Sequence, residues 1–284
     1  MKIYQVDKNV VVQDGNQIKN ITSLRPSIKT SIDLIKVALG NDLSITDYLK
    51  NTMATNRGDL NSSEISSPRI PIDSPETWAF GVTYEDSMKE RQAESDTPDV
   101  YGKVYTADRP EAFFKSTLAR IKGPNDQVGI RKDSTWDVPE PELTFIVFHG
   151  NIIGFTVGND MSSRSIEGEN PLYIPQAKIY NNSAAIGPCW VPIESLDYNN
   201  LNVEMVIKRD SKEVFSGSGN TNLMKRKCDE LNDWLHASND IPDATTVMTG
   251  TGTIPPEEFT LKPGDEIAIT IENIGTLTNT VIEV

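Results

Sequence analysis

The 284-residue sequence predicts an α+β protein with two domains, a small one over residues 1–70 and a large one over residues 71–284. Three observations predict this arrangement. Residues 1–50 combine two short apolar runs of strand length with two segments of helical spacing. Residues 51–75 are rich in Asn, Ser, Asp and Pro, which is typical of an extended linker. From Trp190 onward, alternating strand patterns are interrupted by one helical segment.

In the small domain, residues 3–6 and 10–13 have the composition of strands around a turn at Lys8 and Asn9. Residues 31–39 carry apolar side chains at helical spacing and are followed by Gly40, a common helix terminator. A second helix is expected to begin near Ser44. No residue of this domain has the pattern of a catalytic group.

The composition is that of a soluble globular protein, with 37% hydrophobic residues and no apolar run as long as a membrane span. The 27 basic against 41 acidic side chains give a formal charge of -14, which argues against nucleic acid or an anionic membrane as a partner. Cys189 and Cys228 are expected to be buried, reduced thiols. The segment after Met1 lacks the pattern of a secretory leader, so a cytoplasmic location is expected.

A predicted β-hairpin carries three carboxylates. Glu140 and Glu142 stand two apart before an apolar run, and the strand period of two places both on one face. A turn signal at residues 149–151 and a second apolar run then bring Asp160 back to the same end. Three converging carboxylates favour a hard divalent cation, Mg²⁺ first and then Mn²⁺ or Ca²⁺. The alternative is a solvated acidic strand end.

Glu111 and Lys115 flank the aromatic pair Phe113 and Phe114. Both a helix and a strand would place Glu111 and Lys115 on one face, so their spacing leaves the backbone undecided. Read structurally, they form a surface ion pair worth under roughly 1 kcal/mol. Read functionally, Glu111 is a carboxyl beside apolar rings, where desolvation raises the pKa toward the range useful for proton transfer.

Two later segments contain further candidate residues. The polar stretch 162–180 ends at Lys178 and suits a substrate-lining loop as well as an ordinary surface loop. The glycines of segment 249–253 allow close backbone approach, so this segment is predicted to bind a carboxylate through its amides and the Thr251 hydroxyl. Residues 222–235 have helical spacing, with Asn220 or Thr221 as the cap.

Several motifs follow one another along residues 76–284: Pro139-Glu-Pro-Glu-Leu143, Gly154-Phe-Thr-Val-Gly-Asn-Asp160-Met-Ser-Ser-Arg164, Lys178 with Ile186-Gly-Pro188, Thr249-Gly-Thr-Gly252, and Leu261-Lys-Pro-Gly-Asp265 with Ile274-Gly-Thr-Leu-Thr-Asn279. Together they resemble the fumarylacetoacetate hydrolase family. The resemblance implies a mixed β-roll or β-sandwich catalytic domain behind a small N-terminal α/β domain. It also implies that Glu140, Glu142 and Asp160 hold a divalent metal, with Lys178 beside it.

The sequence departs from the family at one position. In hydrolytic and decarboxylating members, a Tyr-x-x-His sequence opens a mobile helix and its histidine acts as the base. Here Tyr84 is followed by Ser87 at that place, and a serine cannot activate water without a base of its own. The two histidines, His149 and His236, lie outside the family motifs and are expected to be dispensable.

The resemblance and this departure together imply a magnesium-dependent dehydratase of a 2-keto-3-deoxy sugar acid, of the 2-keto-3-deoxy-D-arabinonate type, that yields 2,5-dioxopentanoate. The catalytic residues implied are Glu111 and Lys178. One alternative is a hydrolase that cleaves a carbon–carbon bond in an acylpyruvate or 2,4-diketo acid, an alternative that Glu85 and Asp86 beside Tyr84 keep open. Another is a non-catalytic metal-binding scaffold.

The expected partner is a small 2-keto acid. The side chains expected to contact it are Phe80, Tyr84, Arg91, Tyr173, Gln176 and Thr251. A homodimer or homotetramer is expected because the family forms them.

Overall fold

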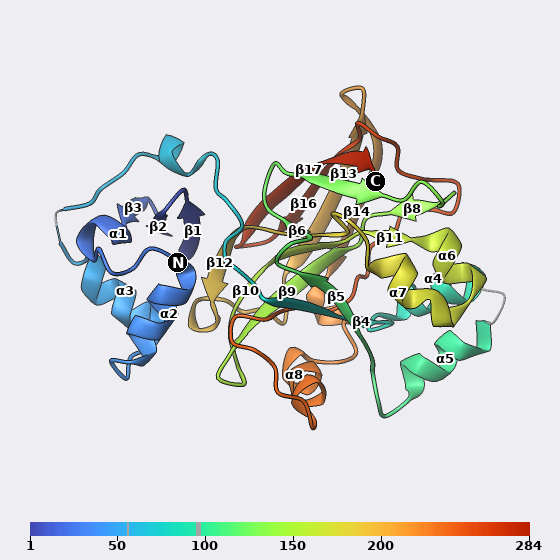
Figure 1. Cartoon of the computed structure of the whole chain (residues 1–284), viewed down its shortest axis with the longest axis horizontal. Coiled ribbons are helices and arrows are strands. Elements are labelled where there is room, and N and C mark those ends of the chain that lie inside the picture. Colours follow the sequence, from blue (N-terminus) through green and yellow to red (C-terminus); the bar gives the residue numbers. More distant parts are fainter. Residues whose placement is uncertain (56, 95–97) are drawn as a thin grey trace.

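The computed structural model describes residues 1–55, 57–94 and 98–284, apart from the side chains of residues 90, 91, 93, 94 and 98. The chain forms a small unit that contains the N-terminus and a larger body that contains the C-terminus (Figure 1). Strands build most of the body and helices lie on its outside, which confirms the predicted α+β class. No helix in the described ranges is long and apolar enough to span a bilayer.

The small unit consists of β1 (Lys2–Val6), β2 (Asn9–Asp14), β3 (Gln17–Asn20), α1 (Ile21–Leu24), α2 (Ser31–Leu39) and α3 (Ile45–Met53). Helix α2 begins after Thr30, which forms a capping box with Asp33, and it ends at Gly40 as predicted. Ser44 caps α3, since its hydroxyl accepts a hydrogen bond from the Asp47 amide at 3.0 Å. The strands and helices predicted for this unit are confirmed.

Among the described residues, the main sheet has ten strands in the order β3-β2-β1-β12-β10-β9-β15-β4-β5, with β6 beside β12. The small unit therefore contributes three strands to the same sheet as the body. The strands from the body are β4 (Glu76–Gly81), β5 (Glu111–Thr117), β6 (Ile121–Lys122), β9 (Pro141–Phe148), β10 (Asn151–Asp160), β12 (Ala184–Pro192) and β15 (Thr246–Met248).

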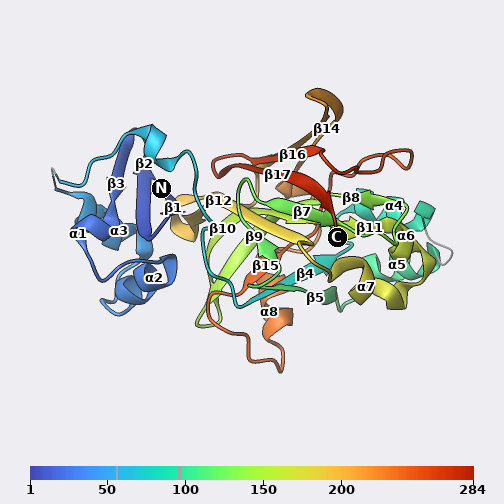
Figure 2. The same cartoon turned by 45° about the horizontal axis from the view of Figure 1, so that its top comes forward.

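A second sheet packs against the main sheet. It contains β14 (Lys212–Asn220), β13 (Asn202–Arg209), β16 (Glu266–Ile271), β17 (Gly275–Glu283) and β7 (Gln127–Ile130), in that order, and a short pair joins β8 (Asp137–Val138) to β11 (Ser162–Ser163). The remaining helices are α4 (Glu85–Glu94), α5 (Pro98–Thr106), α6 (Arg164–Glu169), α7 (Ile174–Lys178), α8 (Cys228–His236) and the 3-10 turns η1 (Ser62–Ile65), η2 (Pro171–Tyr173), η3 (Ile193–Ser195) and η4 (Thr221–Leu223). Figure 2 shows α4 to α7 together at the end of the body away from the small unit.

Strand β9 lies at the centre of the core because both of its faces are buried. Phe145 and Val147 belong to the hydrophobic cluster between the two sheets. Ile146 and Phe148 belong to the cluster under the helices of the small unit. A strand buried on both faces is expected to be a nearly continuous apolar run, and β9 after Glu142 is such a run with Thr144 as its one polar residue.

The small unit and the body are joined through β1 and β12. Ile3 pairs with Trp190, a fully buried residue whose indole nitrogen donates a hydrogen bond to the Ser31 hydroxyl at 3.0 Å. The two parts thus share a sheet and a hydrophobic cluster. The domain boundary at residue 70 stays a prediction. The two thiols, Cys189 and Cys228, are free and buried, as predicted.

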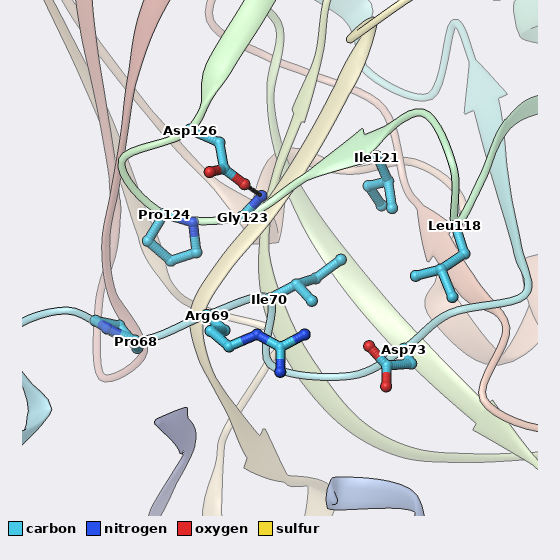
Figure 3. Close-up of a pocket in the computed structure, with 9 residues that line it drawn as sticks. All are labelled: Pro68, Arg69, Ile70, Asp73, Leu118, Ile121, Gly123, Pro124 and Asp126. Atoms are coloured by element: carbon cyan, nitrogen blue, oxygen red, sulfur yellow. Dashed lines mark hydrogen bonds between the residues drawn. The ribbon is translucent and has the colours of Figure 1, made fainter. Parts of the chain in front are cut away.

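The linker between the units runs along the surface of the body. Its residues Pro68 to Asp73 face the turns around β6 across a hollow of about 390 Å³ (Figure 3). The Arg69 guanidinium donates to the Asp7 carbonyl at 3.2 Å, and Asp126 accepts from the Gly123 amide at 2.8 Å. The first bond ties the linker to the small unit, and the second lies within the turn that follows β6.

The helix predicted over residues 222–235 is wrong at its start. Asn220 caps only the short turn η4, and α8 begins at Cys228. The reason is tertiary contact: the backbone between η4 and α8 is held by other parts of the chain, since the Lys225 amide donates to the Thr83 carbonyl at 3.0 Å. Local helical spacing carries no information about such a partner.

Candidate active site and metal centre

The hairpin of β9 and β10 brings three carboxylates together. Across its turn Phe148 pairs with Asn151, and at its other end the amides of Glu140 and Asp160 each donate to the other's carbonyl, at 3.2 and 3.0 Å. Glu142 lies opposite Gly158, on the same face. One ligand oxygen from each of Glu140, Glu142 and Asp160 lies within 4.8 Å of the others, and all three residues are buried. The predicted hairpin and its convergence are confirmed.

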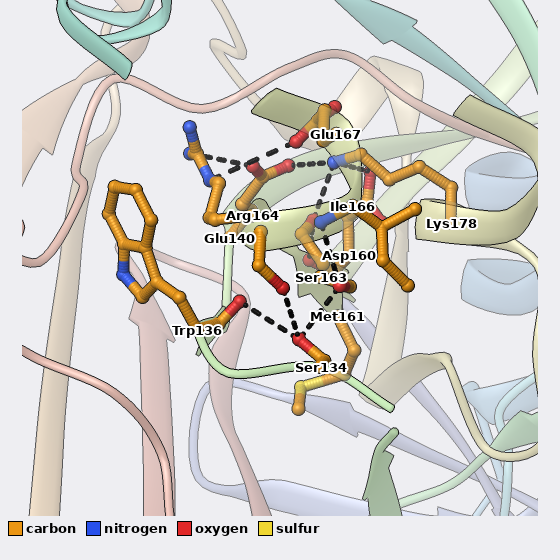
Figure 4. Close-up of polar contacts among 12 residues, drawn as sticks. Ser134, Trp136, Glu140, Asp160, Met161, Ser163, Arg164, Ile166, Glu167 and Lys178 are labelled. Carbon is orange, nitrogen blue, oxygen red and sulfur yellow. Dashed lines mark hydrogen bonds and ion pairs between the residues drawn. The ribbon is translucent and has the colours of Figure 1, made fainter. Parts of the chain in front are cut away.

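Three cationic side chains surround this cluster, and Figure 4 shows two of them, Lys178 and Arg164, beside Glu140 and Asp160. The Lys178 Nζ donates to Glu140 Oε2 at 2.6 Å, to Asp160 Oδ2 at 3.1 Å and to the Ser162 hydroxyl at 2.5 Å. The Arg164 Nη2 donates to Glu140 Oε1 at 2.8 Å. On the other side of Asp160, the Lys115 Nζ lies 2.6 Å from Oδ1.

The charges remain crowded in spite of these partners. Burial raises the pKa of Glu142 well above its usual value, and the negative charges of Asp160 and Glu140 raise it further. Burial likewise lowers the pKa of the Lys115 ammonium. Buried oxygen ligands with excess negative charge suit a hard divalent cation, so the donor set of this site fits magnesium.

A glycine-containing loop supports the third carboxylate. The Gly250 amide donates to Glu142 Oε2 at 2.7 Å, and Gly250 has a φ of 93°, a conformation that other residues rarely adopt. The Thr251 hydroxyl accepts from the Thr253 amide at 3.2 Å and donates to the Thr253 carbonyl at 3.1 Å. The Gly250 amide thus holds a carboxylate of the protein itself, whereas the Thr251 hydroxyl binds the backbone, and the predicted contact of Thr251 with a substrate stays a prediction.

Glu111 is the first residue of β5 and pairs with Gly81 of β4. The spacing of Glu111 and Lys115 allowed either a helix or a strand, and the structure shows a strand. Its alternation places Glu111 and Phe113 on one face, and the register of β5 against β4 shifts after them, at Lys115. The Lys178 Nζ lies 5.6 Å from the centre of the Phe113 ring, and Lys115 contacts Asp160. The carboxyl of Glu111 is therefore directed to the side of the sheet that carries the lysines.

Gly81 makes room for the Glu111 carboxyl, because a Cβ at position 81 would overlap Oε2 and lie 2.8 Å from the carboxyl carbon. Gly81→Ala is expected to lower turnover at least about tenfold, since displacing a reacting group by about 1 Å has effects of this size or larger. Magnesium affinity, measured by calorimetry, should be unchanged in this variant. Normal turnover would mean that the position of the Glu111 carboxyl is irrelevant to the reaction.

Comparison with known proteins agrees with this site. A family model described as fumarylacetoacetate (FAA) hydrolase C-terminal matches residues 76–282. The chain belongs to the fumarylacetoacetate hydrolase family. The match includes β4, the two strands of the hairpin and the loop that binds Glu142, so the residues assembled above all lie within the family domain.

Relatives in the fumarylacetoacetate hydrolase family include two dehydratases. The chain is 44% identical over 267 residues to the probable 2-keto-3-deoxyxylonate dehydratase of Haloferax volcanii, covering 93% of this chain and 92% of that protein. It is 42% identical over 227 residues to the 2-dehydro-3-deoxy-D-arabinonate dehydratase of Saccharolobus solfataricus, covering 77% and 76%. A solved structure of 2-keto-3-deoxy-D-arabinonate dehydratase complexed with magnesium and 2,5-dioxopentanoate aligns with a TM-score of 0.80 and 32% identity over 100% of this chain and 99% of that chain. The predicted family fold is confirmed.

The residues predicted to contact substrate in this family fold lie in different environments. Tyr84 is buried, and its pKa is raised by burial and by the nearby charge of Glu142. Phe80 is buried in the cluster between the sheets. Tyr173 is half-buried at the end of η2, whereas Gln176 is exposed. The side chain of Arg91 lies outside the described residues, and these substrate contacts stay predictions.

Sequence reasoning missed the contact of Lys115 with the candidate metal site. Lys115 is fully buried and donates to the backbone carbonyls of Met161 and Lys178 at 2.8 and 2.6 Å, in addition to its ion pair with Asp160. The period-two relation of Lys115 to Glu111 was the available signal. This relation indicates a shared face only once the segment is known to be a strand. It could not indicate Asp160 as the partner, because Asp160 is far away in the sequence.

Both histidines lie away from this site. His149 is in the hairpin turn, separated from Glu140 by the length of β9, roughly 30 Å at the rise of a strand. It is exposed and pairs with Asp243 at 3.4 Å. His236 ends α8, where its Nδ1 lies 2.9 Å from the Asn232 carbonyl.

Replacing His149 and His236 together by asparagine is expected to leave the turnover number within about threefold of wild type, because neither ring is near the carboxylates. Steady-state kinetics of the double variant measures this. A thousandfold loss, equivalent to about 4 kcal/mol of transition-state stabilisation, would contradict a histidine-free site.

Proposed function

We propose that this protein is a magnesium-dependent dehydratase that converts a 2-keto-3-deoxy sugar acid, of the 2-keto-3-deoxy-D-arabinonate type, to 2,5-dioxopentanoate and water. The observation that carries the proposal is a buried site with three carboxylates and two lysines, to which neither histidine of the chain contributes. Such a site lacks the histidine base by which family members activate water for hydrolysis. The two dehydratase relatives support the same reaction.

Glu140, Glu142 and Asp160 would hold the metal. When bound there, magnesium supplies Lewis-acid chemistry that acidifies the proton next to the keto group. The protein's own contribution is to exclude water, since all three carboxylates are buried, and to hold them in place through Lys178, Arg164 and the Gly250 amide.

Glu111 is proposed as the group that moves the proton at carbon 3. Loss of that proton forms the double bond between carbons 3 and 4 while the bond from carbon 4 to its hydroxyl breaks, and the hydroxyl leaves as water. A proton then moves from carbon 5 to carbon 3, and the resulting enol becomes the carbon-5 aldehyde. A carboxyl can both take and return these protons when its pKa suits the task.

Lys178 is proposed to stabilise the negative charge that develops on the keto oxygen. Its ammonium is buried and hydrogen bonded to two of the candidate metal ligands, so it is oriented before substrate arrives. Fixed charges in a water-excluded site stabilise a transition state more than they would in water. Phe80, Tyr84, Arg91, Tyr173, Gln176 and Thr251 complete the proposed substrate site.

The carbon–carbon hydrolase receives no support from Glu85 and Asp86. Both are exposed on α4 and face Lys89, at 2.9 and 4.0 Å. Both lie outside the buried carboxylate cluster, so neither is placed to activate a water molecule for hydrolysis.

The test is to incubate the protein with magnesium and a panel of 2-keto-3-deoxy sugar acids and acylpyruvates and to identify the products by mass. A product lighter than its substrate by one water is expected from the sugar acids. Two fragments from an acylpyruvate, with no change in the sugar acids, would replace the dehydratase by the hydrolase. No product from any compound would favour the non-catalytic scaffold.

A homodimer or homotetramer and a cytoplasmic location are part of the same proposal. The support for both is indirect: the family forms such oligomers, and the two cysteines are free thiols, as a reducing compartment would keep them. Light scattering on the magnesium-loaded protein would measure the number of subunits.

A further inference from the structure

The start of β5, which carries Glu111, is one end of a long chain excursion. Gly81 at the end of β4 pairs with Glu111, so the chain leaves and re-enters the main sheet at the same point. We name residues 82–84 the entry stem and residues 105–110 the exit stem. Because the exit stem leads directly into Glu111, anything that holds this stem also sets where the carboxyl lies.

The exit stem is held by two adjacent cations from the segment before α8. Arg226 donates to the carbonyl of Ala107 through Nη2 and to that of Asp108 through Nη1, the latter at 3.1 Å. Lys225 donates to the Tyr105 carbonyl, and its Nζ lies 4.3 Å from the centre of the Tyr105 ring. Three carbonyls of the stem, those of residues 105, 107 and 108, are thereby held by two neighbouring side chains.

The same segment holds the entry stem through its backbone. The Lys225 amide donates to the Thr83 carbonyl at 3.0 Å, and the Thr83 hydroxyl donates to the Thr249 carbonyl at 2.7 Å. The next amide along, that of Gly250, is the one bound to Glu142. Residues 225–226 are therefore hydrogen bonded directly to both stems, and Thr83 and the Thr249–Gly250 peptide link the entry stem to Glu142.

Because the carbonyls that Arg226 binds belong to exposed residues, losing Arg226 should change the position of the exit stem more than the stability of the fold. Arg226 is only 6% exposed, whereas Ala107 and Asp108 are exposed. Without Arg226 their carbonyls would be solvated rather than buried without partners, so the loss of stability should be small. The other partner of Arg226 is Glu230 at 2.6 Å, whose side chain is 42% exposed. Because Glu230 reaches solvent, losing this pair does not leave a buried carboxylate without a partner.

We propose that Arg226 is a positioning residue for the reaction, one that fixes the exit stem and thereby the Glu111 carboxyl opposite Gly81. The expected loss of turnover rests on the proposed function. The expected loosening of the exit stem rests on the hydrogen bonds alone. Lys225 assists by joining the exit stem to the entry stem.

The test compares Arg226→Met, Arg226→Lys and the matched control Glu230→Gln, each as the full chain with magnesium. Arg226→Met should lower the turnover number at least about tenfold, with magnesium affinity unchanged. Hydrogen exchange followed by mass spectrometry should become faster in residues 82–84 and 105–110 and stay unchanged in β13. Arg226→Lys, which keeps the charge and can reach one carbonyl, should fall between Arg226→Met and wild type. Glu230→Gln should resemble wild type.

Three results would overturn the proposal: unchanged exchange in the exit stem of Arg226→Met, faster exchange there with normal turnover, or equal defects in Glu230→Gln and Arg226→Met. If Arg226→Met does not fold, the partial variant Arg226→Lys decides between the same outcomes. Should the wild-type protein dehydrate no sugar acid, the proposed function fails. The exchange measurement then still decides whether Arg226 holds the stem.

Discussion

Replacing Glu142 by glutamine is expected to abolish turnover, with a loss of at least about a thousandfold, and to weaken magnesium binding strongly. Glutamine keeps the shape of the side chain and its oxygen can still accept from the Gly250 amide, but it removes one of the three ligand charges. Calorimetry with magnesium and steady-state kinetics measure the two effects. The matched control is Glu204→Gln, an exposed glutamate on β13 that should behave as wild type.

The same variant should not be less stable than wild type when metal is absent. A raised pKa means that ionisation of Glu142 is disfavoured in the folded state, so this carboxyl lowers stability as the pH rises above the usual glutamate value. Glutamine is neutral at every pH and removes that penalty. The melting temperature of metal-free Glu142→Gln should therefore equal or exceed that of wild type near neutral pH. Unchanged magnesium affinity would refute the metal assignment.

Replacing Glu111 by glutamine should lower turnover by about 100- to 10,000-fold, the usual contribution of a positioned acid or base. Substrate and magnesium should still bind, because the shape of the side chain and the metal ligands are unchanged. Solvent-deuterium exchange at carbon 3 of the substrate should stop, and nuclear magnetic resonance of the recovered substrate measures this directly. Near-normal exchange would show that another group removes the proton.

Lys178→Met is the informative contrast to Glu111→Gln. It removes the donor shared by Glu140 and Asp160, so it should raise the Michaelis constant as well as lower turnover. It should also destabilise the metal-free protein, since it leaves buried carboxylates with fewer partners. Added magnesium should restore part of that stability. Identical kinetic profiles for the two variants would contradict their separate roles.

The hairpin was predictable because its information is local. A period of two places Glu140 and Glu142 on one face, and a turn signal fixes where the chain reverses, so the meeting with Asp160 follows without knowledge of the rest of the fold. The missing histidine at Ser87 was equally visible, because it is read at one position against a family motif.

The remaining parts of the site depend on contacts between distant segments. Nothing near Lys115 in the sequence indicates Asp160, and nothing near Lys225 indicates Thr83, yet these pairings decide where a cation lies and where a helix begins. The amides of the loop 249–253 were predicted to bind a carboxylate, but only the folded chain reveals that it is the side chain of Glu142. The local sequence pattern predicts where helices and strands form, whereas the residues that they contact depend on how distant segments pack in the folded chain.

The pairing of Ile3 with Trp190 limits how far the protein can be shortened. Strand β12 is covered on its outer side by β1 near Trp190 and by β6 at Ala184 and Ala185. A fragment consisting of residues 71–284 would keep every candidate catalytic residue but would expose the backbone donors and acceptors of β12 near Trp190 as a sheet edge. Such edges recruit strands from other molecules, so the isolated fragment would aggregate. Residues 1–70 contribute none of the candidate catalytic residues, but their strand β1 covers an edge of the catalytic sheet that would otherwise be open to strands of other molecules.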